Sequence, residues 1–135
     1  MDIQLNPYLF FRGNCREAMQ FYKNIFGGKL TMQTVGESGV ENSMGMDKNK
    51  IMHASLTGDV NLLASDSKKA SSKASKVSLS LMGTDEARLR KIFKALSSGG
   101  KVFMPLKKQF WGDIFGSLTD KNGVEWMVNI TPRKT

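Results

Sequence analysis

Two ionisable side chains in this sequence have the chemistry of a proton-transfer pair. His53 is the single histidine, and Glu125 stands beside the apolar Trp126 near the C-terminus. An imidazole that is oriented by a carboxylate can act as a general base near neutral pH. The same two groups could complete a metal site with added water, although one His and one Glu are too few ligands for a centre of their own. A lone histidine is more often structural, so both interpretations stay open.

Strand periodicity places these two residues among other polar side chains. In the segment 124–130, Trp126, Val128 and Ile130 alternate with a second set of residues. Alternate residues of a strand point to opposite faces, so the apolar set should face a helix and the second set an open face. The residues predicted to line that open face are His53, Ser55, Ser78, Ser80, Glu125, Met127 and Asn129. A few polar groups among apolar walls suit a small-molecule site, although a solvated sheet face shows the same pattern.

Trp111 and Cys15 are two further candidates with less specific signals. Trp111 stands next to Gly112 in a predicted loop, where an aromatic side chain can serve as a lid, a dimer contact or ordinary packing. Cys15 opens a predicted helix, and the helix dipole lowers a thiol pKa there. We expect that position of the cysteine to be coincidental.

The elements that position these residues occur twice in the same order. A strand at 8–12 precedes a helix at 15–26 that ends at Gly27-Gly28, and a strand at 77–81 precedes a helix at 85–97 that ends at Gly99-Gly100. Asn14 and Thr84 are the predicted N-caps. Three strands should follow each helix, at 29–35, 50–57 and 60–65 in the first copy and at 101–106, 114–119 and 124–130 in the second.

This order predicts an α+β fold made of two βαβββ modules. The first module covers 1–66, a Ser/Lys/Ala-rich linker covers 67–76, and the second module covers 77–135. A glycine-rich polar segment at 36–49 is predicted to be a flexible loop. A four-stranded sheet with one helix has one face uncovered, so that face should meet the other module or enclose a cavity.

Composition restricts the class of protein. With 135 residues, 40% of them apolar, and one cysteine, the chain has the length of one domain and no internal disulfide framework. No apolar run approaches the roughly 20 residues of a membrane span, and the first residues do not resemble a signal peptide. We therefore expect a cytoplasmic protein without a membrane partner.

The formal charge of +8 is concentrated in one part of the chain. Residues 67–108 contain 11 basic and 2 acidic side chains, whereas the flanking segments are close to neutral. A local lysine excess of this kind usually keeps a surface solvated. Nucleic-acid binding is therefore an unfavoured alternative.

Several spaced motifs resemble those of PhnB-like proteins in the vicinal oxygen chelate superfamily of glyoxalases, bleomycin-resistance proteins and extradiol dioxygenases. The motifs are Asn14-Cys15-Arg16-Glu17-Ala18, Phe21-Tyr22-Lys23, Phe26-Gly27-Gly28, His53-Ala54, Ala64-Ser65-Asp66, Gly99-Gly100-Lys101-Val102, Pro105-Leu106, Phe110-Trp111-Gly112, Phe115-Gly116, Asp120, Gly123, Trp126 and Asn129. They extend over nearly the whole chain. The resemblance implies paired βαβββ modules that form a cupped mixed sheet, a homodimer, and a ligand cavity inside the cup.

The resemblance also implies four metal-chelating positions, and this sequence departs from the family there. These positions fall approximately at Pro7, Leu62 or Leu63, Lys76 and Met127, none of which is a normal ligand of a divalent cation. Names of PhnB-like proteins often mention demethylubiquinone methyltransferase, but the sequence shows no methyl-donor fingerprint. We therefore expect no tightly bound metal and no other cofactor.

Three functions remain as hypotheses from the sequence. The first is binding of a small organic molecule in the cupped sheet, with His53 and Glu125 as candidate catalytic residues and Ser55, Ser78, Ser80, Trp111, Met127 and Asn129 as candidate cavity residues. The second is a metal-dependent lyase, isomerase or dioxygenase with His53 and Glu125 as unusual ligands. The third is a non-enzymatic resistance protein that sequesters a drug; strong positive charge disfavours this hypothesis for a cationic drug.

Overall fold

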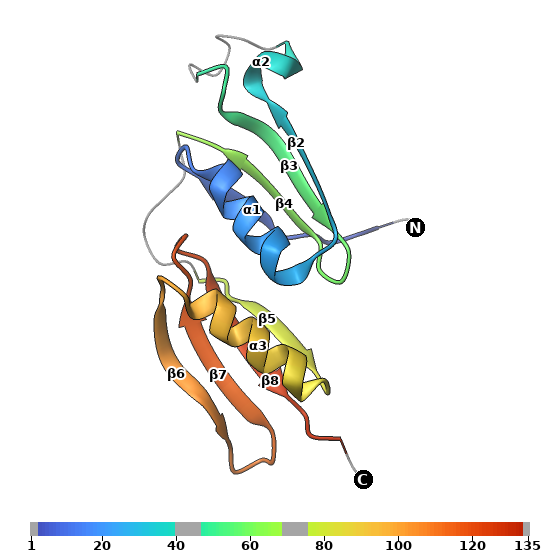
Figure 1. Cartoon of the computed structure of the whole chain (residues 1–135), viewed down its shortest axis with the longest axis vertical. Helices are drawn as coiled ribbons and strands as arrows, with labels where there is room; N and C mark the ends of the chain where they lie inside the picture. The colour runs from blue at the N-terminus through green and yellow to red at the C-terminus, as the bar shows by residue number, and fades with distance from the viewer. Residues whose placement is uncertain (1–2, 40–46, 69–75, 134–135) are drawn as a thin grey trace. The chain divides into compact units, whose positions relative to one another are not determined.

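The computed structural model describes residues 3–39, 47–68 and 76–133, and it divides the chain into two units, Met1–Ser71 and Ser72–Thr135. The predicted linker at 67–76 contains the point of division, and its residues 69–75 lie outside the described residues. Each unit has its own sheet and its own long helix, so each is described by itself (Figure 1).

The first unit has one four-stranded sheet with the strand order β1-β4-β3-β2. Its elements are β1 (Tyr8–Phe11), α1 (Cys15–Phe26), β2 (Lys29–Thr34), α2 (Val35–Ser38), β3 (Ile51–Thr57) and β4 (Leu62–Asp66). Strand β1 pairs in parallel with β4, and the other neighbours are antiparallel. Helix α1 lies across one face of this sheet (Figure 1).

The second unit repeats this arrangement, with the strand order β5-β8-β7-β6. Its elements are β5 (Leu79–Gly83), α3 (Glu86–Ser97), β6 (Lys101–Lys108), β7 (Ile114–Thr119) and β8 (Glu125–Ile130). Strand β5 pairs in parallel with β8, and β7 runs antiparallel to both of its neighbours. The predicted α+β class and the two βαβββ modules are confirmed.

The first unit contains one helix that the sequence did not predict. The segment 36–49 was expected to be a loop, but α2 occupies its start, and residues 40–46 lie outside the described residues. A capping box begins this short helix, because Thr34 Oγ1 accepts a hydrogen bond from the Glu37 amide while the Glu37 carboxylate accepts one from the Thr34 amide.

The helices cover the apolar face of each sheet, as the periodicity predicted. Helix α1 buries Cys15, Ala18, Met19, Tyr22 and Phe26, and α3 buries Leu89, Ile92, Phe93 and Leu96. In β8 the buried residues are Trp126, Val128 and Ile130. We call the other face of each sheet, which no helix of the same unit covers, its open face. Val77 departs from the prediction, because it precedes β5 and is 66% exposed.

Of the two predicted N-caps, Asn14 does occupy the N-cap position of α1, whereas Thr84 does not occupy that of α3. Asn14 makes no side-chain capping bond, and buried Asp66 from the end of β4 accepts hydrogen bonds from the Gly13 and Cys15 amides instead. In α3 the cap is Asp85, whose carboxylate accepts from the Arg88 amide, rather than Thr84. Among the described residues, no helix is long and apolar enough to cross a membrane.

Candidate functional site

The open face of the second sheet holds a cavity of about 280 Å³. We call it the hollow, and it is lined by Ser78, Phe103, Ser117, Leu118, Glu125, Trp126 and Met127. Three of these residues, Ser78, Glu125 and Met127, are among those predicted from the sequence to face a cavity. The structure therefore brings together Glu125 and Met127 of β8 and Ser78, which precedes β5.

Strand register explains how the lining residues meet. Met127 lies opposite Ser117 on β7 and opposite Ser80 on β5, and Glu125 lies opposite Thr119. Because side chains opposite one another in a sheet share a face, Glu125, Met127 and Ser117 all project from the open face.

Leu118 and Trp126 have a different relation to the hollow. Their side chains belong to the buried, helix-facing set, with exposures of 1% and 2%. They therefore border the hollow through the backbone of β7 and β8, and the side-chain walls come from Phe103 and Met127.

A rigid turn precedes Glu125 and fixes its position. Buried Asp120 accepts hydrogen bonds from the Asn122 and Val124 amides through Oδ1 and from the Trp126 indole Nε1 through Oδ2, at 2.8, 3.0 and 2.9 Å. These bonds hold the β7–β8 turn and the Trp126 ring in one arrangement. Asp120 entered the sequence analysis only as a motif residue, and its role as an anchor depends on this tertiary geometry.

The Glu125 carboxylate is incompletely satisfied. Its Oε2 atom is buried and has no hydrogen-bond partner among the described residues. By contrast, the buried carboxylates of Asp66 and Asp120 each accept at least three hydrogen bonds. Since desolvating a carboxylate oxygen without a partner costs free energy, Oε2 of Glu125 is an unmet hydrogen-bond acceptor in a residue that lines the hollow.

Three other predicted cavity residues of this unit do not line the hollow. Ser80 is exposed on β5, next to Met127. Asn129 Nδ2 donates to Asp113 Oδ2 at 2.9 Å and thereby ties β8 to the residue that precedes β7. Trp111 is half-exposed in the β6–β7 connection, where its ring contacts the Phe110 ring edge-on at a centroid distance of 4.9 Å.

Two of the lining side chains were missed by the sequence analysis. Ser117 lies on a strand that was predicted with correct bounds but whose faces were not sorted. Phe103 lies on β6, whose pairing with β7 has register shifts between Val102 and Met104 and between Met104 and Lys107. Such irregularities break the two-residue period, so alternation alone could not place Phe103 on the open face.

His53 and Ser55 lie on the open face of the first sheet. The Tyr8 hydroxyl and His53 Nδ1 are 3.2 Å apart and share a hydrogen bond, and the hydroxyls of Thr31 and Ser55 are hydrogen-bonded at 2.9 Å. Tyr8 was not a candidate in the sequence analysis. His53 and Glu125 belong to different units, so their proposed pairing stays a prediction.

The residues at the four family chelating positions do not fit a metal ion. Leu62 is buried on the helix side of β4, Met127 lines the hollow through a thioether, and Pro7 and Lys76 offer no ligand for a divalent cation. In the described ranges, no group of three or more His, Cys, Asp or Glu side chains could hold a metal. These positions therefore supply no donor set for a chelated divalent ion.

Cys15 is not a reactive thiol in this structure. Its side chain is fully buried at the start of α1, and burial, together with the nearby carboxylates of Asp66 and Glu17, raises its pKa from 9.0 to about 12. Burial therefore outweighs the favourable effect that the start of a helix has on a thiolate.

Comparison with known proteins gives a family match over most of the chain. The sequence profile of the Glyoxalase/Bleomycin resistance protein/Dioxygenase superfamily matches residues 4–128. Protein YjdN of Escherichia coli strain K12 is 31% identical over 144 residues, which cover 96% of this chain and 97% of that protein.

Two solved structures resemble the chain over almost their full length. Protein PA1353 from Pseudomonas aeruginosa is 41% identical with a TM-score of 0.82, and the match covers 98% of this chain and 100% of that one. A protein of Bacillus cereus, described as a putative 3-demethylubiquinone-9 3-methyltransferase, PhnB protein, is 25% identical with a TM-score of 0.76 and coverages of 96% and 100%.

Proposed function

Because the chain belongs to the glyoxalase/bleomycin resistance protein/dioxygenase superfamily and is similar to PhnB-like proteins, we propose that it binds a small organic molecule in the hollow. The observation that carries this proposal is the cavity itself, which lies on the open face and has polar and apolar walls. Its volume of about 280 Å³ is close to the lower end of the range of about 300–1,000 Å³ for small-ligand pockets.

The chemistry of the walls supports a ligand of mixed character. The Phe103 ring and the Met127 thioether offer an apolar surface, whereas Glu125 and the hydroxyls of Ser78 and Ser117 offer hydrogen-bond acceptors. A small number of hydrogen-bonding groups among apolar walls can orient a small molecule. Such a site does not suit an extended polymer.

Binding without a tightly held metal is part of this proposal. The support is the poor donor set at the chelating positions, where Lys76 and Met127 replace ligands. The alternative is a metal-dependent lyase, isomerase or dioxygenase that uses His53 and Glu125. Elemental analysis of the purified protein distinguishes them: stoichiometric metal that disappears in His53→Ala would favour the alternative.

The binding site can be located by amide proton–nitrogen correlation spectra recorded during titration with a library of small organic fragments. We expect fragments to shift the amide signals of Ser78, Ser117 and Met127. In Ser117→Phe the added ring should fill the hollow and abolish these shifts. The matched variant Ser55→Phe places the same ring on the open face of the first sheet and should leave them intact.

Two results would contradict the proposal. One is a library in which no fragment shifts a signal around the hollow. The other is binding that Ser55→Phe abolishes and Ser117→Phe does not, which would place the site on the first sheet. Circular dichroism of both variants checks that each is folded.

A resistance protein that only sequesters its ligand differs from an enzyme in the fate of that ligand. Incubation of a bound fragment with the protein, followed by mass spectrometry, separates the two cases. Recovery of the fragment unchanged would favour sequestration, and a changed mass would indicate turnover.

A further inference from the structure

We propose that the hollow selects ligands in which an ammonium group is attached to a small aromatic body, with Glu125 as the acceptor of that group. This inference rests on the proposed function, because it specifies the ligand class of the same site. The structural basis is the position of a carboxylate and an aromatic ring around one cavity.

The charge of the lining residues favours a cation. Glu125 is the one charged side chain among the residues that line the hollow. Its Oε2 atom is buried, and no hydrogen-bond partner for it exists in the described ranges. A neutral donor would give Oε2 a hydrogen bond but would leave the negative charge of the carboxylate uncompensated. An ammonium supplies both the hydrogen bond and the opposite charge.

The hydroxyl of Ser78 can accept a second hydrogen bond from the ammonium group. Ser78 precedes Leu79, which pairs with Trp126, so Ser78 lies beside Glu125 at the hollow and adds an acceptor to the carboxylate. An anionic ligand finds the opposite situation, because it would be placed against the one charged residue that lines the hollow, Glu125; the basic Lys101 is near the Phe103 ring but does not line the hollow.

The aromatic part of the proposal comes from Phe103 and Met127. The ammonium of Lys101 lies over the Phe103 ring at 5.4 Å from its centroid, so a face of this ring already receives a cation. A thioether such as that of Met127 makes favourable contacts with aromatic rings. A flat ligand body can therefore contact both walls while its ammonium group reaches Glu125.

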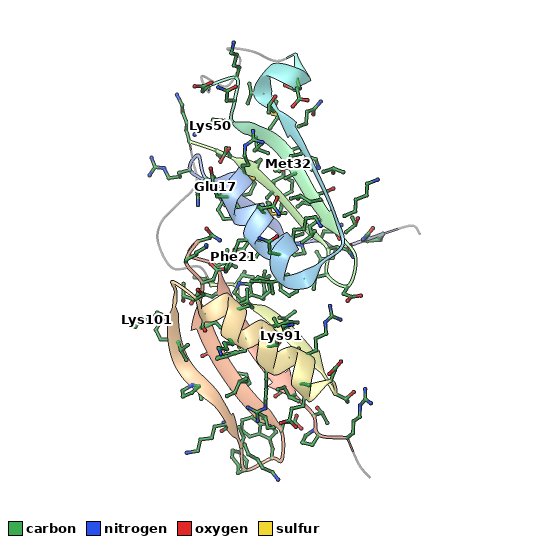
Figure 2. All side chains as sticks on the ribbon, viewed as in Figure 1. Glu17, Phe21, Met32, Lys50, Lys91 and Lys101 are labelled. Atoms are coloured by element: carbon green, nitrogen blue, oxygen red, sulfur yellow. The ribbon has the colours of Figure 1, made fainter. Side chains whose placement is uncertain are left out.

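Within the chain, the Lys101 ammonium competes with such a ligand for interaction with Glu125. It extends from β6 and is labelled in Figure 2. It pairs in register with Thr119, which in turn pairs with Glu125 across β7 and β8. Its ammonium therefore belongs to the same open face as the carboxylate, and its removal should strengthen binding of a cationic ligand.

Three probes of the same shape and different charge test the inference: phenethylammonium, phenethyl alcohol and hydrocinnamate. Binding to the full-length protein is measured by isothermal titration calorimetry at neutral pH and low salt. We expect phenethylammonium to bind about tenfold more tightly than phenethyl alcohol, the size expected for one added charge-assisted hydrogen bond. Hydrocinnamate should bind most weakly.

Substitutions then assign the preference to Glu125. Glu125→Gln keeps the shape of the side chain. It should lower the affinity for phenethylammonium by about tenfold and leave the affinity for phenethyl alcohol unchanged. The control Glu86→Gln makes the same charge change on α3, where Glu86 pairs with Arg90 at 2.8 Å, and should alter neither affinity. Lys101→Met should raise the affinity for phenethylammonium and leave the affinity for phenethyl alcohol unchanged.

The outcomes separate this inference from the proposed function. Equal affinities for phenethylammonium and phenethyl alcohol would overturn the inference and leave the proposed binding function in place. A preference for the cation that persists in Glu125→Gln would also overturn it. If none of the three probes binds and fragments fail to shift the hollow's amide signals, both proposals are wrong.

Discussion

At the scale of single residues, three carboxylates in the described part of the chain fall into two kinds. Asp66 and Asp120 hold backbone amides in place, and Asp120 also holds an indole, whereas Glu125 keeps one oxygen without a partner among the described residues. The first kind stabilises the fold, because each amide that it satisfies would otherwise be buried unpaired. The second kind leaves a binding requirement that the fold does not meet.

Asp66 should be indispensable to the first unit. Its carboxylate accepts hydrogen bonds from the amides of Gly13, Cys15 and Ile51 at 2.8–2.9 Å. Asp66→Asn replaces one accepting oxygen by a donor that faces amide donors, so we expect a loss of about 2 to 4 kcal/mol in the free energy of unfolding. Urea denaturation measures the loss.

A matched carboxylate provides the control for this prediction. Asp85 caps α3 from an exposed position, where its carboxylate accepts a hydrogen bond from the Arg88 amide at 3.2 Å. Because Asn and Asp are similarly good N-caps, Asp85→Asn should change the stability by only a few tenths of a kcal/mol, about the scatter of the measurement. Equal losses in the two variants would contradict the assigned role of Asp66.

The raised pKa of Cys15 predicts how the free energy of unfolding changes at alkaline pH. Its pKa is raised to about 12 in the folded chain by burial first and then by Asp66 and Glu17, against an ordinary value of 9.0. Above pH 9.0 the unfolded chain loses the thiol proton and the folded chain keeps it, so the unfolded chain binds fewer protons. The free energy of unfolding should therefore fall as pH rises, by up to about 1.4 kcal/mol per pH unit from this group.

The comparison that isolates this effect is wild type against Cys15→Ala over the same alkaline range. Lysine and tyrosine titrations are common to both proteins and cancel in the difference. The stability of the wild type should fall more steeply, and parallel pH profiles would show that the thiol does not titrate differently in the two states.

At the scale of elements, the duplicated glycines have the same structural task in each unit. Gly28 precedes Lys29, which pairs with Thr57, and Gly100 precedes Lys101, which pairs with Thr119. A Cβ atom on either glycine would collide with the backbone oxygen of the corresponding threonine. The turn from helix to strand thus presses against the end of the neighbouring strand in both units.

Alanine substitution at these glycines should be strongly destabilising. We expect Gly28→Ala and Gly100→Ala each to cost about 3 kcal/mol or more, because the obstacle is backbone and cannot rotate away. Gly123→Ala is the control: it has φ of +87° but no atom within 4 Å of the added Cβ, so it should cost only about 1 to 2 kcal/mol. Thermal unfolding gives the ranking, and a Gly123→Ala variant as unstable as Gly100→Ala would contradict it.

Element bounds were predictable where the signal is local. Helix α1 and strand β7 have their predicted bounds, because the signals are local: a double glycine directly follows α1, and both elements show regular periodicity. The carboxylate that accepts from the amides at the start of α1 was not predictable, since Asp66 is distant in sequence and approaches only through the parallel pairing of β1 with β4. Helix α2 was missed because it is a single turn in a glycine-rich segment.

At the scale of the whole molecule, the fold was more predictable than the site. Two copies of one element order fix the topology, and the sequence shows both copies. Glu125 and Met127 were predicted to face a cavity because β8 alternates regularly, whereas Phe103 was missed because β6 does not. The pairing of His53 with Glu125 concerns two units, and no pattern within one strand or helix determines such a distance.

The chain should form a homodimer in solution, as its resemblance to PhnB-like proteins implies. The second unit exposes large apolar side chains, among them Phe110 at 96%, Met82 at 73% and Trp111 at 52%. Exposed apolar surface of this kind is typical of protein interfaces.

Size-exclusion chromatography with light scattering should give twice the 15.0 kDa of one chain. The double variant Phe110→Ser and Trp111→Ser should shift this mass toward the monomer, whereas Lys107→Ser and Lys108→Ser on the adjoining strand should not, because lysines contribute little to interface cores. A monomeric mass for the unaltered chain at every concentration would contradict the expectation, and it would mean that solvent covers these aromatic side chains.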